Sequence, residues 1–252
     1  MQVVEIWRYP VKSVGGEPLT SALVTARGLL GDRSHGIVDT ETGMVLTARR
    51  APDLLHATAR LVGTTASAGV EVTLPDGTRI DAGRSDPAAV DRTLSDWLGR
   101  PVELRAAGPD GGTFEAPLDV EHDADWVSWQ GPGLAWHDSD KARVSLVSVG
   151  SLGEWDARRF RANVVLSGAG EDELVGHRLA VGTAHLDVAK RIGRCVMVTR
   201  PQPGLERDLD VLRTINRVRG GNLAIGSLVS RPGMLMVGDD VEDLGDVGIP
   251  ER

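Results

Sequence analysis

Cys195 is the only cysteine in a chain of 252 residues. The residues just before it are rich in positive charge: Lys190, Arg191 and Arg194. A thiol attacks another group or binds a metal only as the thiolate, and neighbouring positive charge favours that form. Residues 196–199 include β-branched side chains and predict a strand that leads away from the cysteine and ends at Pro201. A lone cysteine is more often buried and inert, so the other polar clusters of the sequence must decide between the two interpretations.

Four polar clusters share a position at an expected strand end or turn, where folds commonly place binding groups. They are Lys12-Ser13, Asp32-Arg33, Arg159-Phe160-Arg161 with Asn163, and Arg194-Cys195. Arginine contacts a phosphate through two parallel hydrogen bonds, and lysine adds a point charge. A thiolate beside these cations suits a soft metal or sulfur chemistry. The clusters therefore predict a site for a ligand that combines a phosphate with a soft metal.

Mostly β-strands are expected to carry the clusters of the first half. Residues 3–11 alternate apolar and polar side chains, and further short strands are predicted at 22–25, 36–39 and 44–49. Asp76-Gly77 is the clearest hairpin signal, because this pair adopts the positive φ of a tight turn. Short strands at such spacing are typical of a barrel or a sandwich.

One helix is expected among these strands, between Asp86 and Gly99. Asp86 is a suitable N-cap, and Pro87 fits the first helical position. Apolar residues follow at helical spacing, and Gly99 provides the C-terminal stop.

The second half predicts another group of strands with a short helix. Residues 142–149 form the first of these strands, and residues 233–240 form the last. Ser151 with Glu154 has the pattern of a capping box, which predicts a helix beginning at Ser151. The last strand is followed by an acidic tail.

Residues 108–140 lack a regular pattern and are rich in glycine, proline and acids. Three of the six tryptophans lie here: Trp126, Trp129 and Trp136. Long segments without secondary structure are usually linkers or functional lids. The segment is interpreted either as a domain junction whose tryptophans line the mouth of a pocket or as a plain linker. Its histidines and acids, among them Asp119, Glu121, His122, Asp123 and Asp125, lack the spacing of zinc or calcium ligands.

Composition narrows the classes of function. The net charge of −8 gives no indication of a nucleic-acid or membrane partner. One cysteine excludes an internal disulfide framework and a cysteine-rich metal cluster. The first residues lack the basic and apolar regions of a signal peptide, and no apolar run approaches the roughly 18 residues of a membrane span. The sequence therefore predicts a cytoplasmic protein.

These motifs together resemble the MOSC-domain proteins, which are named after the C-terminal domain of molybdenum-cofactor sulfurases. In the first half the resemblance rests on residues 7–13, 28–33 and 46–49. In the second half it rests on residues 159–164, 171–173, 194–195 and 232–241. The resemblance implies a mainly β fold with a few helices (α+β). A β-rich N-terminal MOSC-type domain is expected at residues 1–115, a MOSC β-barrel domain at 116–242, and the acidic tail at 243–252.

The resemblance also implies a molybdenum cofactor, a pterin with a phosphate tail and a molybdenum–dithiolene head group. This matches the phosphate and the soft metal that the residues themselves predict. Cys195 matches the cysteine that ligates molybdenum in the amidoxime-reducing members, so it is expected to be the metal ligand and the catalytic residue. Six further positions match cofactor contacts, the first three chiefly to the phosphate: Lys12, Ser13, Arg33, Arg161, Asn163 and Arg194.

The implied function is that of an oxidoreductase. It would reduce N-hydroxylated or N-oxide compounds by oxygen-atom transfer, with electrons from separate flavin or iron–sulfur proteins. The sequence departs from the family at His35, where an aromatic residue is common, and at residues 200–204, which lack the acidic-proline pattern of the animal relatives. Two alternatives remain: a carrier of the molybdenum cofactor or of persulfide sulfur that turns over nothing, and a β-barrel binding module with an incidental thiol.

Overall fold

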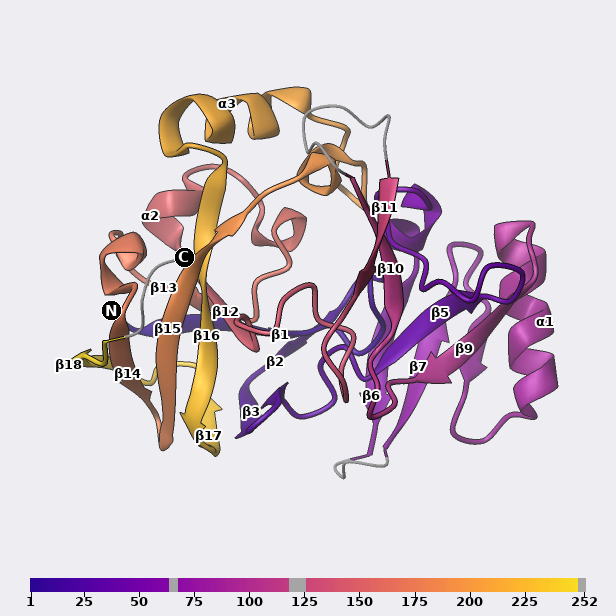
Figure 1. The fold of residues 1–252 in the computed structure, drawn as a ribbon, viewed down its shortest axis with the longest axis horizontal. Helices are drawn as coiled ribbons and strands as arrows, with labels where there is room; N and C mark the ends of the chain where they lie inside the picture. Colours follow the sequence, from indigo (N-terminus) through magenta and orange to yellow (C-terminus); the bar gives the residue numbers. More distant parts are fainter. Residues whose placement is uncertain (64–67, 118–125, 249–252) are drawn as a thin grey trace.

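The computed structural model describes residues 1–63, 68–117 and 126–248. The chain is mostly β, with three α-helices in the described part (Figure 1). This confirms the predicted fold class. Figure 1 shows the strands between residues 144 and 231 on the left, beneath α3 (Leu209–Arg219), and the strands between residues 35 and 106 on the right, toward α1 (Pro87–Leu98).

The largest sheet has eight strands and is curled. In spatial order its strands are β18 (Val241–Asp246), β14 (His177–Val181), β15 (Ala184–Gly193), β16 (Asn222–Arg231), β12 (Val144–Ser148), β13 (Val164–Leu166), β1 (Val3–Arg8) and β2 (Glu17–Leu19). The first two strands of the chain thus complete a sheet built mainly from its second half. Because β1 pairs antiparallel with β13, residues 9–13 leave the sheet beside the residues that precede β13.

Apolar side chains cover both faces of this sheet. One face buries a cluster that includes Val144, Leu186 and Ile225. On the other face, Val211 and Ile215 of α3 (Leu209–Arg219) pack in a cluster with residues of β12 and β13. The remaining short helices of the second half are α2 (Val149–Leu152), η2 (Ala157–Arg159), η3 (Glu171–Leu174) and η4 (Val196–Thr199).

The remaining strands of the described residues form four smaller sheets, and the strands between residues 35 and 106 surround a core of their own. The four sheets are β17-β3-β4 (Gly233–Met236, Ser21–Thr25, Gly28–Leu29), β5-β9 (His35–Asp39, Val102–Ala106), β6-β7-β8 (Thr58–Val62, Gly69–Thr73, Arg79–Asp81) and β10-β11 (Thr113–Pro117, Trp126–Gln130). Val24, Leu29 and Leu235, from one of these sheets, belong instead to the core of the large sheet. Helix η1 (Pro52–His56) and helix α1 (Pro87–Leu98) complete the first half of the chain. The hairpin predicted at Asp76-Gly77 is present as β7-β8, with Gly77 at φ 88°. Helix α1 has its predicted stop, since Gly99 is left-handed.

Several local expectations are wrong. Residues 196–199 form the 3₁₀-helix η4, and the strand at Cys195 is β15, which precedes it. Helix α2 begins earlier than predicted, because Ser148 is its N-cap and accepts a hydrogen bond from the amide of Ser151. Residues 108–140 contain the β10-β11 hairpin, and residues 44–49 contribute only isolated bridges at Val45. Residues 243–246 of the expected tail are paired in β18.

The acids and the histidine noted between residues 119 and 125 lie outside the described residues. Among residues 1–63, 68–117 and 126–248, no helix is both long and apolar enough to span a bilayer.

Candidate functional site

The seven site residues expected from the sequence all line one cavity of about 350 Å³: Lys12, Ser13, Arg33, Arg161, Asn163, Arg194 and Cys195. They come from four separate stretches of the chain. The structure therefore brings together every residue of the expected site.

Asn163 joins two of these stretches, because it is tied to both β1 and β12. Its backbone carbonyl accepts a hydrogen bond from the Trp7 amide at 2.8 Å. Its side-chain oxygen accepts from the backbone N and from Oγ of Ser145, at 3.1 and 3.0 Å, and its Nδ2 donates to the Trp7 carbonyl. The buried amide thus has its hydrogen bonds within the fold, so its main effect is to hold β1 against the second half of the chain.

The cavity is strongly cationic in a protein of net charge −8. Its lining contains seven basic residues and one carboxylate, that of Asp138. The basic residues are Lys12, Arg33, Arg49, Arg159, Arg161, Lys190 and Arg194. A recess walled by like charges concentrates the field and attracts anions. The site is therefore built for a ligand that carries several negative charges.

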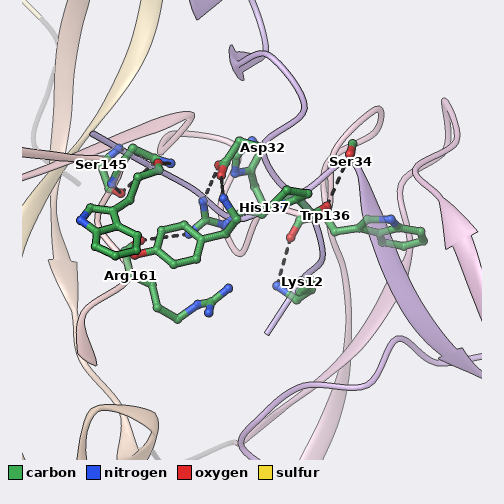
Figure 2. A network of polar contacts seen from close by, with 12 residues as sticks. Lys12, Asp32, Ser34, Trp136, His137, Ser145 and Arg161 are labelled. Carbon is green, nitrogen blue, oxygen red and sulfur yellow. Dashed lines mark hydrogen bonds and ion pairs between the residues drawn. The ribbon is translucent and has the colours of Figure 1, made fainter. Parts of the chain in front are cut away.

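Lys12 is a buried ammonium at one end of the cavity, with a relative exposure of 3%. Its Nζ donates to Oδ1 of Asp138 at 2.7 Å and to the carbonyl of Trp136 at 3.1 Å, and it lies 4.3 Å from the centre of the Phe114 ring. Burial lowers the pKa of Lys12, and the nearby carboxylate of Asp138 opposes this effect. Figure 2 shows Lys12 directed at the Trp136 carbonyl while the indole points away.

Arg33 and Arg161 lie over the ring of buried Tyr9, with guanidinium carbons 5.2 and 4.3 Å from its centre. Arg33 forms an ion pair with the buried carboxylate of Asp32 and also donates to the Arg161 carbonyl at 3.2 Å. Burial, followed by repulsion from Arg33, lowers the pKa of Arg161 to about 10. Both guanidinium groups are therefore charged at neutral pH, and aromatic faces stabilise such desolvated cations.

Arg194 is held by the backbone on two sides. Its Nε donates to the Leu223 carbonyl at 2.6 Å, and Nη1 donates to the Phe160 carbonyl at 2.9 Å. Burial lowers the pKa of Arg194 to about 10, which leaves it charged at neutral pH. Its Nη2 is buried without a hydrogen-bond partner among the described residues. An unpaired buried donor is costly, and an anionic ligand in the cavity would supply the acceptor.

Backbone strain is concentrated at the same place. Ser13, Arg33 and Arg161 have φ values of 64°, 50° and 53°, in the left-handed region that side chains other than glycine rarely adopt. In the described part of the chain only two other non-glycine residues share this property, Leu134 and Ala224. Such strain costs about 1–3 kcal/mol at each residue and clusters at functional sites.

Cys195 follows β15 and stands at the N-cap of η4. Arg49 donates from Nε to its Sγ at 3.4 Å. Of the cations expected around the thiol, Lys190 and Arg194 line the cavity, whereas Arg191 is exposed and outside it.

Other residues of the cavity were not expected from the sequence as binding groups. They are Thr47, Arg49, His137, Asp138 and Lys190. Arg49 occurred only within the motif at residues 46–49, and no spacing rule connects it to a cysteine so distant in sequence. Burial lowers the pKa of His137 to about 4, so this side chain is neutral at pH 7. It lines the cavity as a polar and uncharged group.

Trp129 and Trp136 do not line the cavity, contrary to expectation. Trp136 is buried with Phe114, and Trp129 stacks on the same ring. It is the residues that follow Trp136, namely His137, Asp138 and Ser139, that reach the cavity. The side chain of Trp126 lies outside what the structure describes.

A metal at Cys195 would need ligands from another molecule. Within the described residues, no group of three or more His, Cys, Asp or Glu side chains could hold a metal ion. Cationic side chains surround the thiol, and they suit the anionic parts of an organic cofactor that brings its own metal ligands. The residues present thus fit a phosphorylated, metal-bearing cofactor.

Two family models match the chain. The MOSC N-terminal beta barrel domain matches residues 1–109, and the MOSC domain matches residues 135–242. The chain belongs to the MOSC family, as a member in which an N-terminal MOSC β-barrel domain precedes the MOSC domain.

Individual relatives agree with this assignment at low identity. The molybdenum cofactor sulfurase of Drosophila grimshawi is 28% identical over 91% of this chain, which spans 32% of that protein. The chain thus covers about a third of the length of the sulfurases it matches. The mitochondrial amidoxime-reducing component 1 of Homo sapiens is 26% identical over 96% of this chain and 83% of the human protein. Among solved structures, the YuaD protein of Bacillus subtilis is 14% identical, covers 95% of this chain and 93% of its own, and has a TM-score of 0.46. The sulfurase and the amidoxime-reducing component support a function related to the molybdenum cofactor for this family.

Proposed function

We propose that the cationic cavity binds the molybdenum cofactor, that Cys195 is the protein ligand of molybdenum, and that the protein reduces N-hydroxylated or N-oxide compounds. One observation carries the proposal: a single cavity holds the only thiol of the chain, a guanidinium with an unpaired buried donor, and six further basic side chains. The name of the human relative, an amidoxime-reducing component, supports the reaction class.

Each group of residues has a separate role in this proposal. Lys12, Arg33 and Arg161 would bind the phosphate of the cofactor, since all three are cations that line the cavity. Lys12 and Arg161 are buried, and the two arginines have strained backbone. Arg194 would donate its free Nη2 hydrogen to an anionic group near Cys195. Ser13 and Asn163 would hold the cavity in shape rather than contact the cofactor directly. The Ser13 hydroxyl accepts a hydrogen bond from the Ala48 amide, and the Asn163 side chain donates to the Trp7 carbonyl in β1.

When bound, the cofactor supplies two-electron redox chemistry at molybdenum. The overall reaction consumes the N-hydroxy compound, two electrons and two protons, breaks the N–O bond, and yields the reduced nitrogen compound and water. The electrons would come from a separate electron-transfer protein of the flavin or iron–sulfur class. The residues of this chain would orient the cofactor and hold the Cys195 thiolate toward the metal. Arg49 would fix the direction of the thiol through its hydrogen bond to Sγ.

Elemental analysis of purified protein from cells supplied with molybdate tests the proposal. The wild type should contain close to one molybdenum per chain, and both Cys195→Ser and Lys12→Gln should lose most of it. Lys141→Gln is the matched control, because Lys141 does not line the cavity. Molybdenum-loaded wild type should then reduce an amidoxime when an electron donor is added. Absence of molybdenum from the wild type would refute the proposal, and loaded protein that exchanges cofactor but reduces nothing would favour the carrier.

A further inference from the structure

A second hollow, of about 410 Å³, reaches Cys195 from the side of α3. It shares four residues with the cationic cavity: Arg49, Gly193, Arg194 and Cys195. Its other lining residues belong to α3, to the turn that follows it and to the start of β16: Leu212, Asn216, Gly220, Gly221 and Asn222. The thiol therefore stands at the junction of two spaces.

The two spaces differ in chemistry. Five basic side chains and the carboxylate of Asp138 line the cationic cavity but not the second hollow. Apart from the two shared arginines, the hollow presents one leucine, two side-chain amides and glycine backbone. Amides offer both donors and acceptors without charge. The hollow thus suits an uncharged polar ligand, whereas the cationic cavity suits an anion.

Gly193 lies at the junction, and the fold does not require a glycine there. It is exposed at the end of β15, where it pairs with Asn222. Its φ is not positive, and an added Cβ would meet only Oδ1 of Asn222, at 3.8 Å. By contrast, Gly220 and Gly221 have φ values of 57° and 82°, which favour glycine for backbone reasons. A side chain at position 193 would instead occupy space beside the thiol.

The junction also contains a donor that lacks an acceptor. Arg194 lines both spaces, and its Nη2 is buried without a hydrogen-bond partner among the described residues. In the proposed function this donor bonds an anionic group of the cofactor, so it marks the junction as the place where cofactor and substrate would meet.

We infer that the hollow beside α3 is a second ligand subsite, which receives the uncharged end of the substrate, and that Gly193 sets the size of substrate that can reach Cys195. This inference rests on the proposed function, since the substrate would be a neutral N-hydroxylated compound. Such a compound presents N–H and O–H donors together with lone pairs, and these match the amides of Asn216 and Asn222. The empty position at Gly193 leaves room for a bulky group at the reacting nitrogen.

Access can be measured without any cofactor, because Cys195 is the only cysteine. The apoprotein is alkylated with iodoacetamide and with bulky, uncharged N-phenylmaleimide. Gly193→Val and Asn216→Trp should slow the maleimide by about tenfold or more and slow iodoacetamide less, with unchanged melting temperatures. Ser139→Trp, which narrows only the cationic cavity, and Gly108→Val, which adds a side chain in open space away from the thiol, are the controls. Equal maleimide rates in all variants would overturn the inference.

The loaded protein supplies the second readout. Gly193→Val should keep the molybdenum content of the wild type and should raise the ratio of KM for a bulky aromatic amidoxime to KM for a small one about tenfold. Loss of molybdenum from this variant would overturn the inference, because Gly193 would then serve cofactor binding. If the wild type itself holds no molybdenum, the proposed function fails, and alkylation rates alone decide whether the hollow leads to the thiol.

Discussion

Asp32 is the buried counter-charge of Arg33, and replacing it by asparagine should destabilise the protein strongly. Its side chain has no exposed surface, and that of Arg33, its ion-pair partner, is 13% exposed. Asparagine retains an oxygen that can accept the Tyr9 amide, which now bonds Oδ1 at 2.8 Å. The change therefore removes the charge while preserving that hydrogen bond.

The expected loss follows from burial. Breaking a buried ion pair by removing one partner costs about 3–5 kcal/mol, because an uncompensated charge is left inside. In this protein the uncompensated Arg33 would also repel Arg161, which shares the face of Tyr9. For a chain of this length each kcal/mol lowers the melting temperature by about 2–4 °C, so we expect a decrease of about 6–20 °C.

Urea unfolding at constant ionic strength measures the change, with inorganic phosphate as the ligand. Phosphate should stabilise Asp32→Asn more than the wild type at equal concentration, because Arg33 has lost its carboxylate partner in the variant. At a hundredfold excess over Kd, binding contributes about 2.7 kcal/mol. Asp81→Asn, at a partly exposed carboxylate whose paired Arg84 is largely exposed, is the control and should cost about 1 kcal/mol or less. A loss below about 1 kcal/mol for Asp32→Asn, or equal stabilisation by phosphate, would contradict this electrostatic account.

Three further predictions concern His137, Cys195 and the ion pairs of Arg219. Burial lowers the pKa of His137 from 6.5 to about 4. The unfolded chain therefore takes up a proton first as pH falls, and the free energy of unfolding should decrease between pH 6.5 and 4 by at most about 3 kcal/mol. In urea titrations, His137→Gln should abolish this decrease. The ratio of the alkylation rate with anionic iodoacetate to that with neutral iodoacetamide should be higher for Cys195 than for free cysteine. This ratio should fall as the salt concentration rises from about 0.01 to about 1 M. A ratio that does not depend on salt would contradict a cationic cavity. Arg219→Met leaves the fully buried carboxylate of Glu171 beside that of Asp172 without their shared cation. The free energy of unfolding, measured in urea, should fall by about 3–5 kcal/mol. A decrease under about 1 kcal/mol would show that the cluster is solvated.

The fold class was predictable because the signals for it are local. Asp-Gly at residues 76–77 requires no tertiary contact to favour a hairpin, and Pro87 and Gly99 mark the ends of α1 by backbone chemistry alone. The failures occurred where a side-chain hydrogen bond decides the local structure. Thr199 has a strand-forming side chain, yet it donates from Oγ1 to the Val196 carbonyl within η4. Ser151 fits an N-cap, but its hydroxyl donates to the buried Glu171, and Ser148 caps the helix instead.

The candidate site was predictable only in part, for a related reason. Arg33 and Arg161 each lie within a recognisable sequence motif. Their residue type and the residues beside them in sequence therefore indicated an anion site. Arg49 bonds the thiol across 146 positions of sequence, through a segment that is neither the expected strand nor any other regular element. Gly193 had no signal at all, because its importance lies in the space that it leaves open beside Cys195.

Several features make the cavity costly, and a bound anion would offset two of them. Strained backbone at Ser13, Arg33 and Arg161, the mutual repulsion of two guanidinium groups, and the unpaired Nη2 of Arg194 each raise the free energy of the folded protein without a ligand. An anion bound among them relieves the repulsion and supplies the missing acceptor. Because a ligand that binds only the folded state stabilises it by mass action, the stability of this protein and the occupancy of its cavity must rise together. A cavity that served only to pack the two halves of the chain would have no reason to retain these costs.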